Sequence, residues 1–189
     1  GFIGRYILEG SKPGAAAASV WLTHKVLPLD YSGHGRLVAL TMRGALVLHS
    51  ALAAEHWGEF RIVPLPRPDL NIVCFAVGHP SMQTLEELNE AAERVYQALS
   101  VSPSRPTRAL DYVLTKTVLR AEEYGEAALP LVARLGFTAD DYRRAGGLAV
   151  LRCTVLDPFL VAGGARVDYV RGFLDTVRTE FERALRAGE

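Results

Sequence analysis

The residues best suited to chemistry form a turn near the start of the chain, Gly10-Ser11-Lys12-Pro13-Gly14. Glycine lets the backbone pass close to another group, and proline suits the first turn of a helix, where its missing N–H loses no partner. The alanines that follow predict a helix whose free N–H groups and dipole would attract an anion beside Ser11. The turn is therefore a candidate anion site, with capping of its own helix by Ser11 as the alternative.

Lysine can form an imine with a carbonyl cofactor, and the chain holds only Lys12, Lys25 and Lys116. A nucleophilic lysine needs desolvation or a neighbouring cation, because its amine must first lose a proton. Lys12 lies in a turn before proline, and nothing in the sequence requires that any of the three be buried. We therefore expect none of them to be an imine lysine, and we predict surface positions for Lys25 and Lys116.

Histidine, cysteine and arginine supply the other candidate groups. The five histidines show no metal-binding spacing, so packing or surface roles are expected for all of them and no metal site is predicted. Cys74 and Cys153 lie in apolar strand-like runs, which predicts buried free thiols and a reducing cytoplasm. Arg152 also lies in an apolar strand, where it needs a partner. We expect that partner to be a carboxylate such as Asp157 or a group across an interface, and a structural role is favoured over substrate binding.

The composition argues against several classes of protein. Lysine plus arginine and aspartate plus glutamate both number 21, so no net charge favours nucleic acid or an acidic membrane surface. Hydrophobic residues make up 49% and charged residues 22%, as in ordinary globular proteins. The apolar runs are interrupted and are expected to be too short to span a bilayer, and no signal peptide is evident. The glycine-rich phosphate loop of nucleotide-binding proteins is missing as well.

The first third of the chain is predicted to be helical. One helix is expected over residues 13–27, ended by Pro28, and a second over residues 36–57. The second helix is apolar on more than one face, which suits burial between layers or at a subunit interface, and Gly44 marks a place for close packing. Prolines at 64, 66 and 68 predict an extended connector, so we place the domain boundary between residues 1–59 and residues 60–189.

Residues 60–189 alternate between strand and helix patterns. Thr84 with Glu87, and Thr138 with Asp141, have the spacing of capping boxes that begin helices. This alternation predicts an α+β lobe in which a small sheet carries helices on one face. The strands are expected over residues 60–65, 71–77, 112–118 and 148–155, and the longer helices over residues 84–99 and 167–185.

Four segments, in order, resemble the group II family of pyridoxal-phosphate-dependent amino-acid decarboxylases, of which bacterial tyrosine decarboxylases are members. The first is the Gly-Ser-Lys-Pro-Gly-Ala turn with its apolar helix; sphingosine-phosphate lyases, which are more distant, have a similar Gly-Ser-Arg-Pro-Gly turn. The others are Pro-Asp-Leu-Asn-Ile-Val-Cys-Phe at 68–75, Leu-Gly-Phe-Thr at 135–138 and the stretch over 144–155. The resemblance spans nearly the whole chain.

This resemblance implies a fold type I transferase-like protein of the α/β class. Residues 1–59 would be the helical, dimer-side end of the large cofactor domain, and residues 60–189 the small C-terminal domain. Gly10 and Ser11 would contact the phosphate of pyridoxal 5'-phosphate bound to the neighbouring subunit of a homodimer. Thr115 would lie near the substrate ring, although alternating hydroxyls on an exposed strand face are the favoured explanation, and Lys116 departs from the bacterial enzymes.

The resemblance also implies that the chain is the C-terminal part of a longer cytoplasmic protein. It starts without Met, and it lacks the Asp-Pro-His type of run that precedes the cofactor lysine in this family. That lysine would lie in an N-terminal part or in a separate chain, so this chain alone is not expected to be catalytic. The whole protein is expected to decarboxylate an amino acid, a small-molecule substrate, with aromatic L-amino acids among the candidates. The alternatives are a non-catalytic dimerisation or regulatory module, and a carbon–carbon lyase for phosphorylated amino alcohols.

Overall fold

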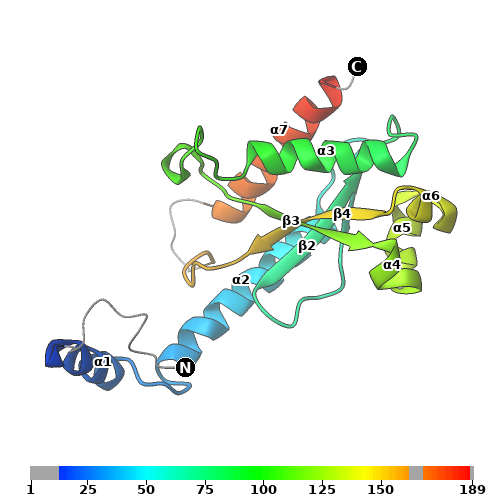
Figure 1. The fold of residues 1–189 in the computed structure, drawn as a ribbon. Helices are drawn as coiled ribbons and strands as arrows, with labels where there is room; N and C mark the ends of the chain where they lie inside the picture. The colour runs from blue at the N-terminus through cyan, green and yellow to red at the C-terminus, as the bar shows by residue number, and fades with distance from the viewer. Residues whose placement is uncertain (1–12, 162–167, 188–189) are drawn as a thin grey trace, which may run out of the picture. The chain divides into compact units, whose positions relative to one another are not determined.

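The computed structural model describes residues 13–161 and 168–187, and the chain divides into two compact units, residues 1–40 and residues 41–189 (Figure 1). Gly10, Ser11 and Lys12 lie outside the described residues, so the predicted anion site and its cofactor contact stay predictions.

The first unit contains helix α1, Gly14–Val26, which follows the extended residue Pro13. None of the residues of α1 is buried, and Trp21 is 63% exposed. The turn after α1 depends on Gly33, because a Cβ atom there would lie 2.1 Å from the carbonyl oxygen of Pro28. The side chain of Asp30 accepts hydrogen bonds from the backbone and hydroxyl of Ser32, which lower the pKa of that carboxyl. These bonds fix the turn that leads into α2.

Helix α2, His34–Ala54, carries its buried residues in the second unit. These are Gly44, Ala45, Leu48 and Leu52, and the last three belong to the hydrophobic core. A Cβ atom at Gly44 would lie 3.1 Å from Cγ1 of Val155, so the predicted close packing at this glycine is confirmed. A Cβ atom at this position would require the Val155 side chain to shift by a few tenths of an ångström.

The length of α2 corrects one expectation. Its 21 residues are long and apolar enough, by length and composition alone, to cross a membrane. The expectation that every apolar segment is too short is therefore wrong. The apolar pattern of α2 has a second explanation, because the core helix of a globular protein passes the same test and α2 contributes to the core of the second unit.

The second unit is built on a four-stranded sheet. Its strands are β1, Arg61–Pro64, β2, Ile72–Gly78, β3, Thr115–Arg120, and β4, Gly147–Thr154. The order is β1-β2-β4-β3, and all neighbours are antiparallel. The α+β prediction for this part is confirmed, with β3 starting three residues later than expected.

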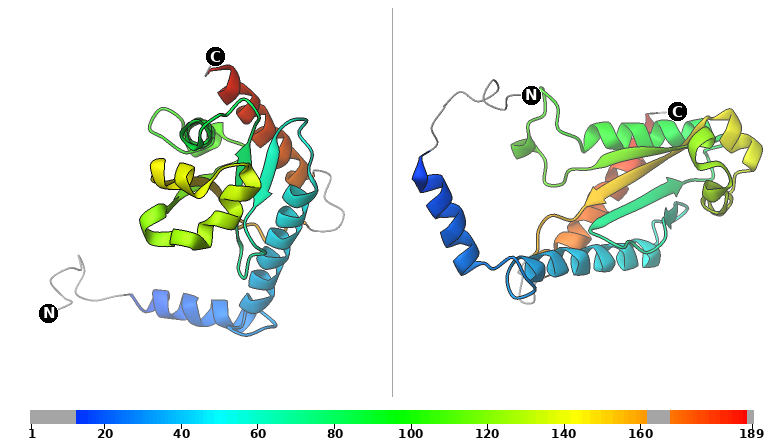
Figure 2. Two further views of the ribbon diagram at one scale, coloured as in Figure 1. Left: turned by 90° about the vertical axis from the view of Figure 1, so that its right-hand side faces the viewer. Right: turned by 60° about the horizontal axis from the view of Figure 1, so that its bottom comes forward.

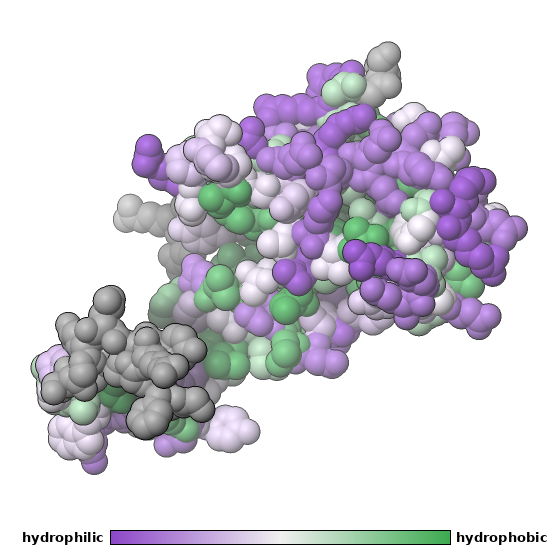
Figure 3. All heavy atoms as spheres, in the orientation of Figure 1, coloured by the Kyte–Doolittle hydropathy of each residue, from purple (hydrophilic) through white to green (hydrophobic). Residues whose placement is uncertain are grey.

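Two long helices cover one face of this sheet. Helix α3, Leu85–Ala98, begins with the predicted capping box of Thr84 and Glu87. Helix α7, Tyr169–Arg186, begins at Asp168, whose side chain accepts a hydrogen bond from the backbone of Arg171. The two helices pack together beside the strands (Figure 1), and Figure 3 shows mainly hydrophilic side chains over α3.

Three short helices gather at one end of the sheet (Figure 2). They are α4, Ala121–Tyr124, α5, Leu129–Leu135, and α6, Ala139–Arg144. The 3-10 turn Gly125–Ala128 joins α4 to α5, and another, Thr107–Ala109, lies in the loop before β3. Leu135 of α5 lies 3.5 Å from the position of a Cβ atom at Gly78, on the face opposite α3. The expectation of helices on one face only is therefore corrected, because α5 covers one end of the other face.

Candidate functional site

Three side chains lie in a row across the middle strands of the sheet. Arg152 of β4 is directly opposite Thr115 of β3 on one side and Cys74 of β2 on the other. Directly opposed residues of antiparallel strands point to the same face. The next residues along, Lys116 and Leu151, point to the face covered by α3 and α7. The row therefore lies on the opposite face, beyond the end that α5 covers, and we call it the open-face row.

Two hydrogen bonds join Thr115 and Arg152. The hydroxyl of Thr115 donates to the carbonyl oxygen of Arg152 over 3.0 Å, and Nε of Arg152 donates back to the same hydroxyl oxygen over 2.9 Å. Within residues 13–161 and 168–187, no carboxylate lies within ion-pair distance of Arg152. The expected pairing with Asp157 is wrong, because Asp157 Oδ1 instead accepts the backbone N–H of Phe159 over 2.8 Å.

The two cysteines are free thiols, as predicted, but only one of them is buried. Cys74 is partly exposed in the open-face row. Burial raises the pKa of the Cys74 thiol, and the positive charge of Arg152 opposes this effect. Cys153 faces the covered side of the sheet, where burial raises the pKa of its thiol much further. Both thiols are therefore poor nucleophiles near neutral pH.

Lys116 has a structural partner on the covered face. Its ammonium group forms an ion pair with Glu93 of α3 and lies 5.2 Å from the ring centre of Tyr96. The hydrogen bond from Lys116 lowers the pKa of the Glu93 carboxyl, although burial opposes the shift. The prediction of a surface position for Lys116 is corrected, since the lysine is partly buried and ties β3 to α3. Lys25 lies on exposed α1 near the Trp21 ring, as expected for a surface lysine.

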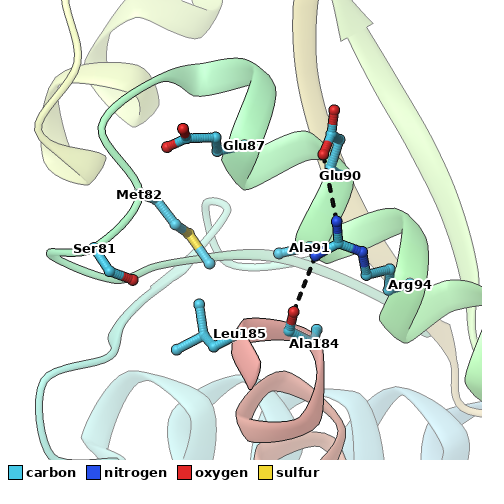
Figure 4. A pocket seen from close by; sticks show the side chains of 8 residues that line it. All are labelled: Ser81, Met82, Glu87, Glu90, Ala91, Arg94, Ala184 and Leu185. Carbon is cyan, nitrogen blue, oxygen red and sulfur yellow. Dashed lines mark hydrogen bonds and ion pairs between the residues drawn. The ribbon is translucent and has the colours of Figure 1, made fainter. Parts of the chain in front are cut away.

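The second unit also has hollows, and α7 lines two of them. One, of about 170 Å³, lies beside the end of β4 and is lined by Tyr112, Cys153, Asp157 and Phe173 among others. The other, of about 300 Å³, lies between α3 and α7, where Arg94 bonds to Glu90 and to the carbonyl oxygen of Ala184 (Figure 4). Arg94 is the only cation among the described residues that line the second hollow, and these bonds engage both of its terminal amino groups.

The described residues do not by themselves make a pyridoxal-phosphate site. Lys25 is exposed and Lys116 is committed to Glu93, so neither described lysine is placed to bind the cofactor's aldehyde. Any such site needs residues outside the described ranges or another part of the protein.

Comparison with known proteins identifies the second unit. Residues 52–181 match the family model described as "Tyrosine decarboxylase, C-terminal". The chain belongs to this family. It is 33% identical over 162 residues to an L-tyrosine decarboxylase of Levilactobacillus brevis, covering 84% of this chain and 26% of that protein. L-tyrosine decarboxylases of Enterococcus faecalis and Enterococcus faecium are 32% and 28% identical over the same length. The chain thus spans about a quarter of these relatives.

For this tyrosine decarboxylase C-terminal chain, the structure separates residues that the sequence placed together. Thr115 lies on the open face, whereas Lys116 points into the covered face. Sequence reasoning missed both the Thr115–Arg152 pair and the Lys116–Glu93 pair. The alternation of side chains along a strand could have predicted that Thr115 and Lys116 face opposite sides of the sheet. The pairing of Thr115 with Arg152 depends on the register of β3 against β4, which no local signal in the sequence encodes.

Proposed function

We propose that this chain is the C-terminal portion of a pyridoxal-phosphate-dependent L-amino-acid decarboxylase whose substrate is L-tyrosine or a related aromatic amino acid. The observation that carries the proposal is the match of residues 52–181 to the tyrosine decarboxylase C-terminal family. Three relatives named L-tyrosine decarboxylase support it over most of this chain. Because the chain spans only about a quarter of those proteins, the activity is proposed for the whole protein.

Within this proposal, the chain binds and positions, and the remainder of the protein supplies the cofactor lysine. Gly10 and Ser11 contact the cofactor phosphate of the neighbouring subunit in a cytoplasmic homodimer. The second unit presents its open-face row, with Thr115, toward the region that binds the amino-acid substrate. When bound, pyridoxal phosphate supplies the electron sink that decarboxylation requires. Neither nucleic acid nor a membrane is part of the proposal.

The test is to express the protein together with the part that precedes this chain and to supply L-tyrosine and pyridoxal phosphate. We expect equal amounts of tyramine and carbon dioxide, and visible absorbance from bound cofactor. Ser11→Ala should weaken cofactor binding by roughly tenfold or more, because a hydrogen bond to a charged group is lost. Ser19→Ala is the matched control, since among the described residues the Ser19 hydroxyl donates only to the carbonyl oxygen of Ala15 in its own exposed helix.

Other results would replace the proposal. Cofactor binding without amine formation from any L-amino acid, but with cleavage of a phosphorylated amino alcohol, would identify a carbon–carbon lyase. Failure to bind the cofactor, in a protein that still dimerises, would identify a non-catalytic dimerisation or regulatory module. Retained cofactor affinity in Ser11→Ala would remove Ser11 from the cofactor site and leave helix capping as its role.

A further inference from the structure

Two histidines of the first unit have ring nitrogens that lack partners among the described residues. Nδ1 of His24 and Nε2 of His34 are both shielded from solvent, and neither forms a hydrogen bond with any residue of 13–161 or 168–187. Most buried polar atoms in folded proteins have a partner, so an atom that lacks one calls for an explanation such as a bound water or ion. Here the two nitrogens belong to neighbouring rings, whose centres lie 5.6 Å apart.

The turn between the two helices brings these rings together. His24 lies in the last turn of α1, and His34 is the first residue of α2. The backbone N–H of His34 donates to the carbonyl oxygen of Pro28 over 2.9 Å, and that of Gly35 donates to the carbonyl oxygen of Asp30 over 2.8 Å. These bonds hold the start of α2 against the loop that follows α1. The backbone therefore restricts the positions that the two rings can take, as a binding site requires.

The separation of the two rings suits a shared metal ion. A zinc–nitrogen bond is about 2.0–2.1 Å long, which places a bound zinc ion about 3.2 Å from the centre of each ring. Two rings that share one ion therefore have centres about 5.2 Å apart for a tetrahedral angle and about 6.4 Å apart for a linear arrangement. The separation of 5.6 Å falls between these values.

The donor type selects the class of ion. Histidine is the commonest metal ligand in proteins, and its neutral imidazole suits zinc, copper and nickel. We propose that His24 and His34 together bind one divalent ion of this class. No third histidine, cysteine, aspartate or glutamate of the described residues joins the pair in a metal-binding group, so water would take the remaining positions around the ion. The bound ion would hold the end of α1 to the start of α2.

The pair is accessible to an ion from solvent. None of the residues of α1 is buried, and both histidines are only partly buried. An ion can therefore reach the two rings without opening a core. Motifs such as His-Glu-x-x-His do not reveal this pair, because its members belong to different helices. The proposal goes beyond the proposed function, since it involves neither the cofactor nor the amino-acid substrate.

The experiment measures zinc binding to the full-length protein by calorimetric titration, after purification without a histidine tag and removal of metal by a chelator. The variants are His24→Gln and His34→Phe, the second of which keeps an aromatic ring and removes both nitrogens. Both substitutions lie outside the core of the second unit, so that unit should still fold. The matched control is His56→Gln, because His56 is an exposed histidine outside the pair.

The wild-type protein and His56→Gln should bind one zinc ion per chain that both pair variants bind at least about 10- to 100-fold more weakly. That range is the usual effect of losing only the hydrogen-bond partner of a metal ligand, and losing the ligand itself should cost no less. Copper or nickel should compete with zinc for the same site.

Three results would overturn the proposal. Zinc binding that is equal in all four proteins would place the ion elsewhere, and loss in only one of the two pair variants would mean that the rings do not share it. No binding to the wild-type protein would leave water as the partner of the two nitrogens. A wild-type protein that binds zinc in this way but forms no tyramine would overturn the proposed function and support the metal site.

Discussion

Replacing Lys116 by methionine tests whether this lysine is structural or chemical. The side chains of Lys116 and Glu93 are 33% and 35% exposed, so solvent screens their ion pair and reduces its contribution to about 0.5–1 kcal/mol. The ammonium group also lies 5.2 Å from the centre of the Tyr96 ring, which adds a cation–π contribution of about 0.5–1 kcal/mol. Methionine keeps the hydrocarbon stem, so Lys116→Met should lower the free energy of unfolding by about 1–2 kcal/mol.

The assay is denaturant unfolding of Lys116→Met, Glu93→Gln and the double variant. The two single substitutions should not add, because each removes the same ion pair, and their coupling should be about 0.5–1 kcal/mol. Additive effects would refute the ion pair as a source of stability. Loss of the cofactor's absorbance in Lys116→Met, without loss of stability, would refute the structural role itself and make Lys116 an imine lysine.

The same pair predicts a dependence on pH with a defined sign. The pKa of Glu93 is lowered in the folded chain from its ordinary value of 4.5. Between the two pKa values the unfolded chain binds more protons, so stability rises with pH there. The contribution is complete above about pH 4.5 and is lost as the pH falls through the lower folded pKa. Lys116→Met should flatten this acid limb of the stability profile, and an unchanged limb would contradict the assignment.

Three further substitutions or labels probe other parts of the second unit. Gly44→Val places a side chain against Val155 and should destabilise the fold by about 1–3 kcal/mol, measured by urea unfolding; wild-type stability would show that α2 packs differently. Asn89→Ala removes bonds of 2.9 and 2.8 Å to two backbone groups of β4 and should destabilise by about 1–3 kcal/mol, with faster hydrogen exchange in β4; unchanged exchange would contradict that bridge. Iodoacetamide should modify Cys74 slowly above neutral pH and leave buried Cys153 intact, as mass mapping of peptides would reveal; equal labelling would mean that the sheet opens.

Local signals in the sequence predicted the elements of the second unit well. The box of Thr84 and Glu87 and the box of Thr138 and Asp141 both begin helices, because each depends on residues three apart. The near-continuous apolar runs of β2 and β4 also predicted strands, because such a run involves only neighbouring residues. The start of β3 was misplaced, since Tyr112 and Val113 favour strands but lie before the ladder begins.

The pairings that matter for function could not be predicted in this way. Glu93 and Lys116 are 23 residues apart, and Thr115 and Arg152 are 37 apart. Strand register decides which of these residues meet, and register depends on packing across the whole sheet. The apolar sequence around Arg152 indicated that it needs a partner. It did not indicate that the partner of Nε would be the hydroxyl of Thr115.

Strand β3 connects the anchored side of the sheet to its open side. Lys116 ties one face of the strand to α3, and the hydroxyl of buried Tyr142 donates to the carbonyl oxygen of Leu119 over 2.9 Å farther along. Because Thr115 is adjacent to Lys116, the ion pair of Lys116 also fixes the backbone position of Thr115. This keeps the Thr115 hydroxyl within hydrogen-bonding distance of Arg152. Removing the ion pair of Lys116 should consequently make the backbone of β3 more mobile on both faces of the sheet. Lys116→Met should speed hydrogen exchange of the backbone amides of β3, and unchanged exchange would mean that the ion pair with Glu93 does not hold this strand.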